Sequence, residues 1–233
     1  MKIKHISLLI GIAFLFHACE VQIEDDRRIL VKGNIIDSSN NPLANVSVRS
    51  GVEGTILGEA FSDENGQFQF TSLEADGNYA LDIIVNLSSN DNNWKGSYNI
   101  EHIENPEYSA KRYFYNLTKR KESGYDLGQI ILRNPARLTL FINNIPGDNN
   151  TLKYQLEYMP TICEIDLKSN NFESCWFNSD EYRHLDEDYS NIQVEVDSQL
   201  GSSVTFNYIL NNEPMQSISI PLSNSENTYV FEY

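Results

Sequence analysis

Short alternating segments separated by turn residues are the feature that most constrains the fold of this chain. Hydrophobic and polar residues alternate within each segment, whereas a sustained apolar period of 3.6 residues is missing. Turn clusters separate the segments, and Asn65-Gly66 supplies the positive φ that a tight hairpin requires. The sequence therefore predicts an all-β fold. The strands expected in the first half cover residues 29–36, 44–48, 58–62, 67–70, 79–85 and 126–132.

A second series of strands follows Asn134-Pro135. Proline disfavours helical backbone in the residue before it and ends the preceding strand, so this dipeptide marks a domain boundary. The number of short strands after it is typical of a second sandwich. These strands are expected within residues 138–142, 152–158, 173–177, 192–196, 203–210, 217–220 and 229–233. We therefore expect two consecutive β-sandwich domains, at residues 29–133 and 137–233.

Several linked motifs in the first half occur in the order of a known family. The segments beginning at Gly33, Asn41 and Ser62 read GNIID, NPLANVSV and SDENGQFQF, and Leu73 and Gly77-Asn-Tyr follow them. This arrangement resembles the carboxypeptidase regulatory-like domain over residues 29–133. The resemblance implies a prealbumin-like (transthyretin-like) β-sandwich that acts as a non-catalytic module. It transfers no catalytic residue to this chain.

The N-terminus has the pattern of an export signal. Lys2 and Lys4 precede an apolar run over residues 6–16, which is too short to span a bilayer core. Ala18-Cys19 at its end resembles the lipobox of bacterial lipoproteins. This resemblance implies a signal peptide at residues 1–18, a lipidated Cys19 and an acidic tether at residues 19–28. The alternative is an ordinary signal peptide with a stray cysteine.

The remaining cysteines, Cys163 and Cys175, form an even pair in an oxidising compartment. A disulfide across this span stabilises the fold by roughly 3 kcal/mol. The alternative is a metal site, but zinc needs more ligands than two thiols, and His184 is the only histidine in the C-terminal half. We therefore expect a disulfide.

The charge balance excludes one class of partner. With 17 basic and 33 acidic residues the formal net charge is −16, whereas nucleic-acid binding needs cations that displace phosphate counterions. After residue 18 the histidines are His102 and His184 alone, and neither HExxH nor GxSxG spacing occurs. We expect no nucleic-acid partner, no cofactor and no enzymatic activity.

Aromatic and basic side chains gather in an insertion between Asn86 and Gly124. Aromatic rings stack on sugars, and cations attract anionic glycans or lipid headgroups. The alternative is an ordinary strand at residues 112–117, with packed aromatics and solvated lysines. The candidate ligand surface consists of Trp94, Tyr113, Tyr115, Lys119, Arg120 and Lys121.

A second acidic segment offers hard oxygen ligands for calcium. Its spacing does not follow an EF-hand loop, so a solvated acidic loop is the alternative. The candidate calcium ligands are Asp180, Glu181, Asp186 and Asp188.

These features predict a non-catalytic lipoprotein of the bacterial outer membrane that acts as a binding or assembly module. The acidic stretch 20–26 resembles lipoprotein surface-export signals and favours the external face, with the periplasmic face as the alternative. Two narrower functions remain open. One is an accessory glycan-binding protein of a polysaccharide uptake system, and the other is an adhesin or surface-assembly subunit with an envelope protein as its partner.

Overall fold

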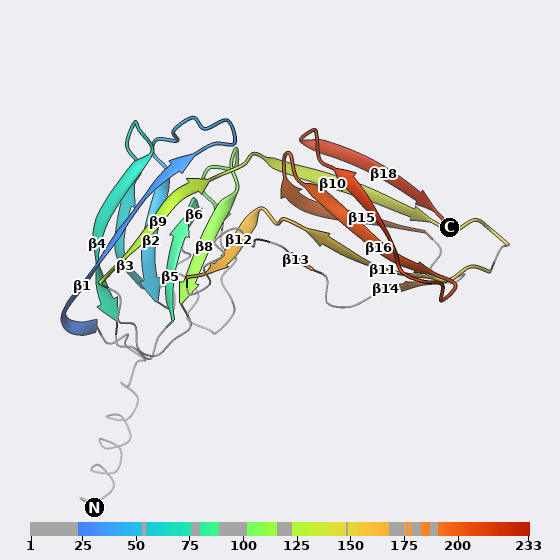
Figure 1. Cartoon of the computed structure of the whole chain (residues 1–233), viewed down its shortest axis with the longest axis horizontal. Helices are drawn as coiled ribbons and strands as arrows, with labels where there is room; N and C mark the ends of the chain where they lie inside the picture. The colour runs from blue at the N-terminus through green and yellow to red at the C-terminus, as the bar shows by residue number, and fades with distance from the viewer. Residues whose placement is uncertain are drawn as a thin grey trace, which may run out of the picture.

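The computed structural model describes residues 23–52, 55–75, 80–88, 102–115, 123–147, 149–167, 175, 177–178, 183–186 and 191–233. Across these residues the fold is all-β and forms two sandwich-like units, as the sequence predicts. The two units follow each other along the long axis of the molecule (Figure 1). Within the described part of the chain, no helix has the length and apolar character needed to cross a membrane.

Two sheets build the first sandwich. In the smaller sheet, of order β4-β1-β9, β1 (Ile23–Ile36) pairs antiparallel with β4 (Gln67–Ala75) and parallel with β9 (Gly124–Ile131). The larger sheet has five strands in the order β12-β8-β5-β2-β3. These strands are β2 (Ser47–Val52), β3 (Thr55–Phe61), β5 (Leu81–Val85), β8 (Ala110–Tyr115) and β12 (Ile162–Asp166). A short pair, β6 (Leu87–Ser88) and β7 (His102–Ile103), follows β5.

Alternation along β1 shows how the sequence creates the first core. Ile29, Val31 and Ile35 are fully buried, whereas Leu30 and Lys32 between them are exposed. Successive side chains of a strand point to opposite faces, so this pattern sends one face into the core and the other to solvent. Each fully buried aliphatic side chain contributes roughly 1.5–3 kcal/mol. The outer face of β1 is therefore in contact with solvent.

Strand β12 is the unexpected element of the first sandwich. It lies beyond Pro135 in the sequence, yet it pairs parallel with β8, from Ile162 opposite Ala110 to Asp166 opposite Phe114. Its neighbours in sequence, β11 (Leu152–Tyr158) and β13 (Phe177–Asn178), belong to the second sandwich (Figure 1). The sequence predicts no strand at residues 162–166, which lie within the range 137–233 expected for the second domain. The chain therefore leaves the first sandwich and returns to complete its larger sheet.

The second sandwich also consists of two sheets. One has the order β15-β10-β18, and the other has the order β13-β11-β16-β17 with β14 also paired to β11. The first sheet contains β10 (Pro135–Asn143), β15 (Asn191–Gln199) and β18 (Glu226–Glu232). The second contains β11 (Leu152–Tyr158), β13 (Phe177–Asn178), β14 (Arg183–Leu185), β16 (Ser203–Leu210) and β17 (Gln216–Pro221).

The core of the second sandwich is separate from the first and is centred on aromatic rings. Phe206 is fully buried in β16, and its ring centroid lies 5.7 Å from that of Tyr154 and 4.9 Å from that of Phe231. Offset and edge-on ring pairs at such distances stabilise beyond their buried area. The two hydrophobic cores predict two separate unfolding transitions.

Candidate functional site

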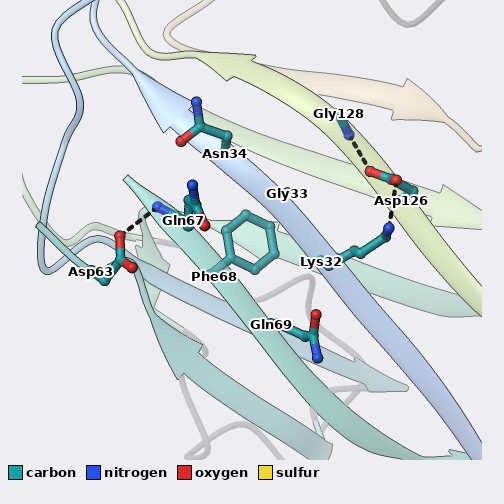
Figure 2. A pocket seen from close by; sticks show the side chains of 9 residues that line it. All are labelled: Lys32, Gly33, Asn34, Asp63, Gln67, Phe68, Gln69, Asp126 and Gly128. Atoms are coloured by element: carbon teal, nitrogen blue, oxygen red, sulfur yellow. Dashed lines mark hydrogen bonds and ion pairs between the residues drawn. The ribbon is translucent and has the colours of Figure 1, made fainter. Parts of the chain in front are cut away.

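A shallow groove crosses the outer face of the β4-β1-β9 sheet (Figure 2) and encloses about 520 Å³. All three strands contribute side chains to it, so it follows the face of the sheet and not its edge. The lining residues are Lys32, Gly33, Asn34, Asp63, Gln67, Phe68, Gln69, Asp126 and Gly128.

Strand register explains why polar side chains meet in this groove. Lys32 lies opposite both Gln69 of β4 and Asp126 of β9, and Asn34 lies opposite Gln67. Residues that face each other across strands on one face of a sheet have Cβ atoms about 5 Å apart. The alternation that buries Val31 and Ile35 therefore arranges amide and charged groups in rows across the outer face.

Two glycines shape the floor and the wall of the groove. A Cβ on Gly33 would lie 2.8 Å from Cζ of Phe68, so the absence of a side chain there accommodates the buried Phe68 ring. The pairing of β1 with β9 shifts register between Lys32 and Asn34, next to Gly128, whose φ is +61°. A Cβ on Gly128 would have no atom within 4 Å. The groove is therefore open to solvent beside Gly128.

The charges of the groove are held by local contacts. Lys32 Nζ lies 3.0 Å from Asp126 Oδ2, and the backbone N–H of Gly128 donates to Asp126 Oδ1. The hydrogen bond from Lys32 and that from Gly128 lower the pKa of Asp126. Asp63 Oδ1 accepts the backbone N–H groups of Asn65 and Gln67.

The side-chain amides of Gln67 and Gln69 differ from these charged groups. Both residues are exposed, and within the described ranges no residue hydrogen-bonds either side-chain amide. Each amide presents donors and an acceptor to whatever enters the groove. These amides are the groups of the groove that remain available to a ligand.

We expect Lys32→Met to raise the pKa of Asp126 toward the ordinary carboxyl value of about 3.9. The substitution removes the strongest group that favours the ionised carboxylate. A carboxyl with a lowered pKa contributes stability above its ordinary pKa and loses it as pH falls through the lowered value. Carbon-detected NMR titration of the side-chain carboxyl measures the shift.

Asp37 provides the internal control for that titration. Its pKa is lowered by the side-chain and backbone N–H groups of Asn41 and not by Lys32. The pKa of Asp37 should therefore be the same in the wild-type protein and in Lys32→Met. An unchanged Asp126 pKa in Lys32→Met would contradict the ion pair.

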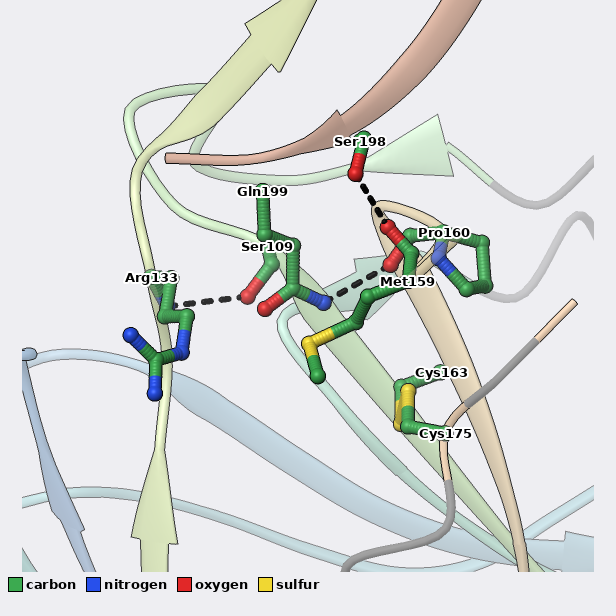
Figure 3. Close-up of a disulfide and its surroundings, with 8 residues drawn as sticks. All are labelled: Ser109, Arg133, Met159, Pro160, Cys163, Cys175, Ser198 and Gln199. Carbon is green, nitrogen blue, oxygen red and sulfur yellow. Dashed lines mark hydrogen bonds between the residues drawn. A yellow bond between two sulfur atoms is a disulfide. The ribbon is translucent and has the colours of Figure 1, made fainter. Parts of the chain in front are cut away.

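The predicted disulfide is confirmed and lies in the first sandwich (Figure 3). The Cα atoms of Cys163 and Cys175 are 5.2 Å apart, and the two residues are 1% and 6% exposed within the first core. Cys163 lies in β12. The disulfide therefore ties the returning strand to the segment that leads back toward the second sandwich.

Hydrogen bonds surround the first two of the three crossings between the sandwiches (Figure 3). At the first crossing, the Ser109 N–H donates to the Arg133 carbonyl at 2.7 Å, and the Arg133 N–H donates to Ser109 Oγ at 3.0 Å. At the second, Ser198 Oγ donates to the carbonyl of Met159, and Gln199 Nε2 donates to that of Pro160, both at 2.7 Å. These contacts fix the chain at these two crossings.

The predicted ligand surface requires a correction at two positions. Tyr113 and Tyr115 are 2% and 6% exposed and pack in the first core, because they occupy alternate inward positions of β8. Burial also raises the pKa of Tyr113. For these two residues the alternative of packed strand aromatics is correct. The other members, Trp94, Lys119, Arg120 and Lys121, lie outside the described residues.

The remaining candidate sites fall largely outside the described residues. These are Cys19 with the signal segment 1–18 and, from the calcium set, Asp180, Glu181 and Asp188. Asp186 is described and half-buried. In the described ranges no group of three or more His, Cys, Asp or Glu side chains is arranged to hold a metal ion.

The groove was not predicted from the sequence. The alternation in β1 and β4 shows that Lys32, Asn34, Gln67 and Gln69 face outward, but it does not show that they meet. The meeting of Lys32 and Asn34 with Gln67, Gln69 and Asp126 depends on the pairing register of strands far apart in the chain.

No family model matches this chain, and no curated protein matches it in sequence. Solved structures with a similar arrangement include the Bacillus anthracis TIE protein (TM-score 0.30, 11% identity, 88% of this chain and 34% of that chain). A second is a Streptococcal ancillary pilin (TM-score 0.26, 8% identity, 90% of this chain and 63% of that chain). A third is the tip fimbrial protein Mfa3 from Porphyromonas gingivalis (TM-score 0.29, 10% identity, 83% of this chain and 81% of that chain). The chain spans about a third of the first protein's length and less than two thirds of the second's.

Proposed function

We propose that this protein is an exported, non-catalytic binding or assembly module of the bacterial envelope, anchored to the outer membrane through a lipidated Cys19. The observation that carries the proposal is the buried Cys163–Cys175 disulfide, which fastens β12 into the first sandwich. Structural disulfides persist in oxidising compartments and are rare in the cytosol. A secreted location agrees with the export signal read from residues 1–18.

The chemistry of the groove supports binding and not acid–base catalysis. A general acid or base works best when its pKa lies near the operating pH. The pKa of Asp126 is instead lowered, and its carboxylate is paired with Lys32. The groove is also open to solvent along an exposed sheet face, whereas catalytic sites commonly exclude water. These features favour binding over catalysis.

The repeated crossings between the sandwiches support a role in presentation or assembly. A single linker allows two domains to move against each other, whereas here the chain passes between the sandwiches three times. The passages are at residues 133–135, at 159–161 and after Cys175. Hydrogen bonds hold the chain at the first two of these crossings. The two sandwiches follow each other along the long axis of the molecule (Figure 1), which suits a module that presents a binding surface.

The anchor is tested by feeding cells radiolabelled palmitate. We expect label in the wild-type protein and in a Cys163→Ala/Cys175→Ala variant, and none in Cys19→Ala, which should leave the outer-membrane fraction. The double variant is the matched control, because it removes the other thiols and keeps Cys19. Label that persists in Cys19→Ala, or is absent from wild type, refutes lipidation. Protease treatment of intact cells then separates the external face from the periplasmic face.

A further inference from the structure

We infer that the groove on the β4-β1-β9 sheet binds a neutral saccharide. This inference rests on the proposed function as a binding module and gives that module a site and a class of ligand. It places saccharide binding on the polar face of the first sandwich, away from the aromatic insertion that the sequence favoured.

The hydrogen-bonding groups of the groove suit hydroxyl-rich ligands. A sugar hydroxyl both donates and accepts, and a primary amide offers both functions on one planar group. Gln67 and Gln69 present such amides from alternate outward positions of β4, opposite Asn34 and Lys32 of β1. Successive outward residues of a strand are about 6.6–7 Å apart. The spacing allows neighbouring hydroxyl groups of one chain of sugars to be bound together.

Charge excludes anionic ligands from the groove. Its single ammonium group, on Lys32, is 3.0 Å from the carboxylate of Asp126, and Asp63 adds a second carboxylate. The lining is therefore net negative within a chain of net charge −16. A phosphate, sulfate or uronate would be repelled, since nearby like charges raise its free energy. A neutral ligand bears no such cost.

The location of the groove argues against an extended peptide. Peptides commonly bind sheets by adding a strand at an edge, where unpaired backbone groups are available. This groove lies over the face of three strands, and the backbone groups of β1 already form ladders with β4 on one side and β9 on the other. Recognition must therefore come from side chains. Those side chains are amides and a neutralised ion pair, with the Phe68 ring beneath Gly33.

Gly128→Asn tests the groove by filling it without touching the core. A Cβ at residue 128 meets no atom within 4 Å, so the added side chain enters open space at the groove wall. Gly128 has a φ of 61°, and Asn occupies the same region elsewhere in this chain, at Asn45 (58°) and Asn212 (61°). Asn is the side chain best suited to that backbone. The fold should therefore persist while the groove is blocked.

The probe is an array of neutral hexasaccharides of glucose, mannose, galactose and N-acetylglucosamine, printed beside uronic-acid and sulfated hexasaccharides. The detergent-solubilised full chain is applied to it, and hits are measured by titration calorimetry. We expect at least one neutral hexasaccharide to bind and the acidic ones not to bind. Gly128→Asn should weaken binding at least tenfold. Gln69→Ala should weaken it about fivefold, as expected for one lost hydrogen bond.

Gly147→Asn is the matched control, because Gly147 also has a positive φ and no atom within 4 Å of a Cβ, but lies in the second sandwich. It should bind like wild type. If Gly128→Asn misfolds by circular dichroism, Gln67→Ala/Gln69→Ala replaces it, since both residues are exposed. Absence of neutral binding, preference for acidic sugars, or unchanged binding in the folded groove variant overturns the inference. Palmitate labelling without saccharide binding refutes the groove alone, and binding without label refutes the anchor alone.

Discussion

Replacing Cys163 and Cys175 together with Ala should lower the free energy of unfolding of the first sandwich by about 3 kcal/mol, the loop-closure contribution of a disulfide across this sequence separation of 12. Ala is preferred to Ser because both sites are buried in an apolar core, where an unpaired hydroxyl adds its own cost. The melting temperature of that unit should fall by roughly 4–8 °C for each kcal/mol lost. Calorimetry measures the transition.

This loss of stability should be concentrated at β12, the strand that returns to the first sandwich. β12 is an edge strand that pairs with β8 in the larger sheet. Without the disulfide it loses its covalent tie to Cys175, so hydrogen exchange in peptides covering residues 110–115 and 162–166 should accelerate. The transition of the second sandwich is the internal control, because its core contains neither cysteine. Unchanged exchange at residues 162–166 would show that β12 holds its place without the bond.

Phe206→Ala should destabilise the second sandwich by about 3–5 kcal/mol, the usual cost of removing a buried phenyl ring. Phe206 is fully buried and contacts the rings of Tyr154, Tyr208 and Phe231, so its loss leaves a cavity and ends three ring contacts. Domains commonly have a stability of only about 5–15 kcal/mol. The melting temperature and the urea midpoint of the second sandwich should therefore fall far below those of the first sandwich.

Phe61→Ala is the matched control, since it makes the same substitution where the ring is 57% exposed. Substitutions at such surface positions usually change stability by no more than about 0.5 kcal/mol. Equal losses in the two variants would mean that the aromatic cluster does not hold the second sandwich together. A fall of the first transition in Phe206→Ala would mean that the two cores unfold as one unit.

Local patterns predicted the strands well because burial imposes a two-residue period. Residues 29–36, 67–70 and 152–158 were expected as strands, and they lie within β1, β4 and β11. The turn at Asn65-Gly66 is also present, with Gly66 at a φ of 76°. The disulfide followed from cysteine parity. All of these inferences use neighbours in sequence.

The pairing of strands that lie far apart in the sequence could not be predicted in the same way. Residues 162–166 alternate, with Cys163 and Ile165 facing inward, but nothing in that pattern specifies β8 as the neighbouring strand. The insertion aromatics illustrate the same difficulty. Tyr113 and Tyr115 have the composition of a binding surface, and only the pairing of β8 with β5 and β12 shows that they face the core.

The return of β12 also sets the order in which this protein can complete its folding. Synthesis proceeds from the N-terminus, so β1 to β9 emerge first, followed by β10 and β11 of the second sandwich, and only then by β12. The first sandwich must wait for a strand that is made after part of its neighbour, with Cys163 unpaired until Cys175 arrives. Such non-local pairing slows folding. Maturation of the two units is therefore interleaved in time, and a chain truncated after residue 133 would lack the last strand of its larger sheet.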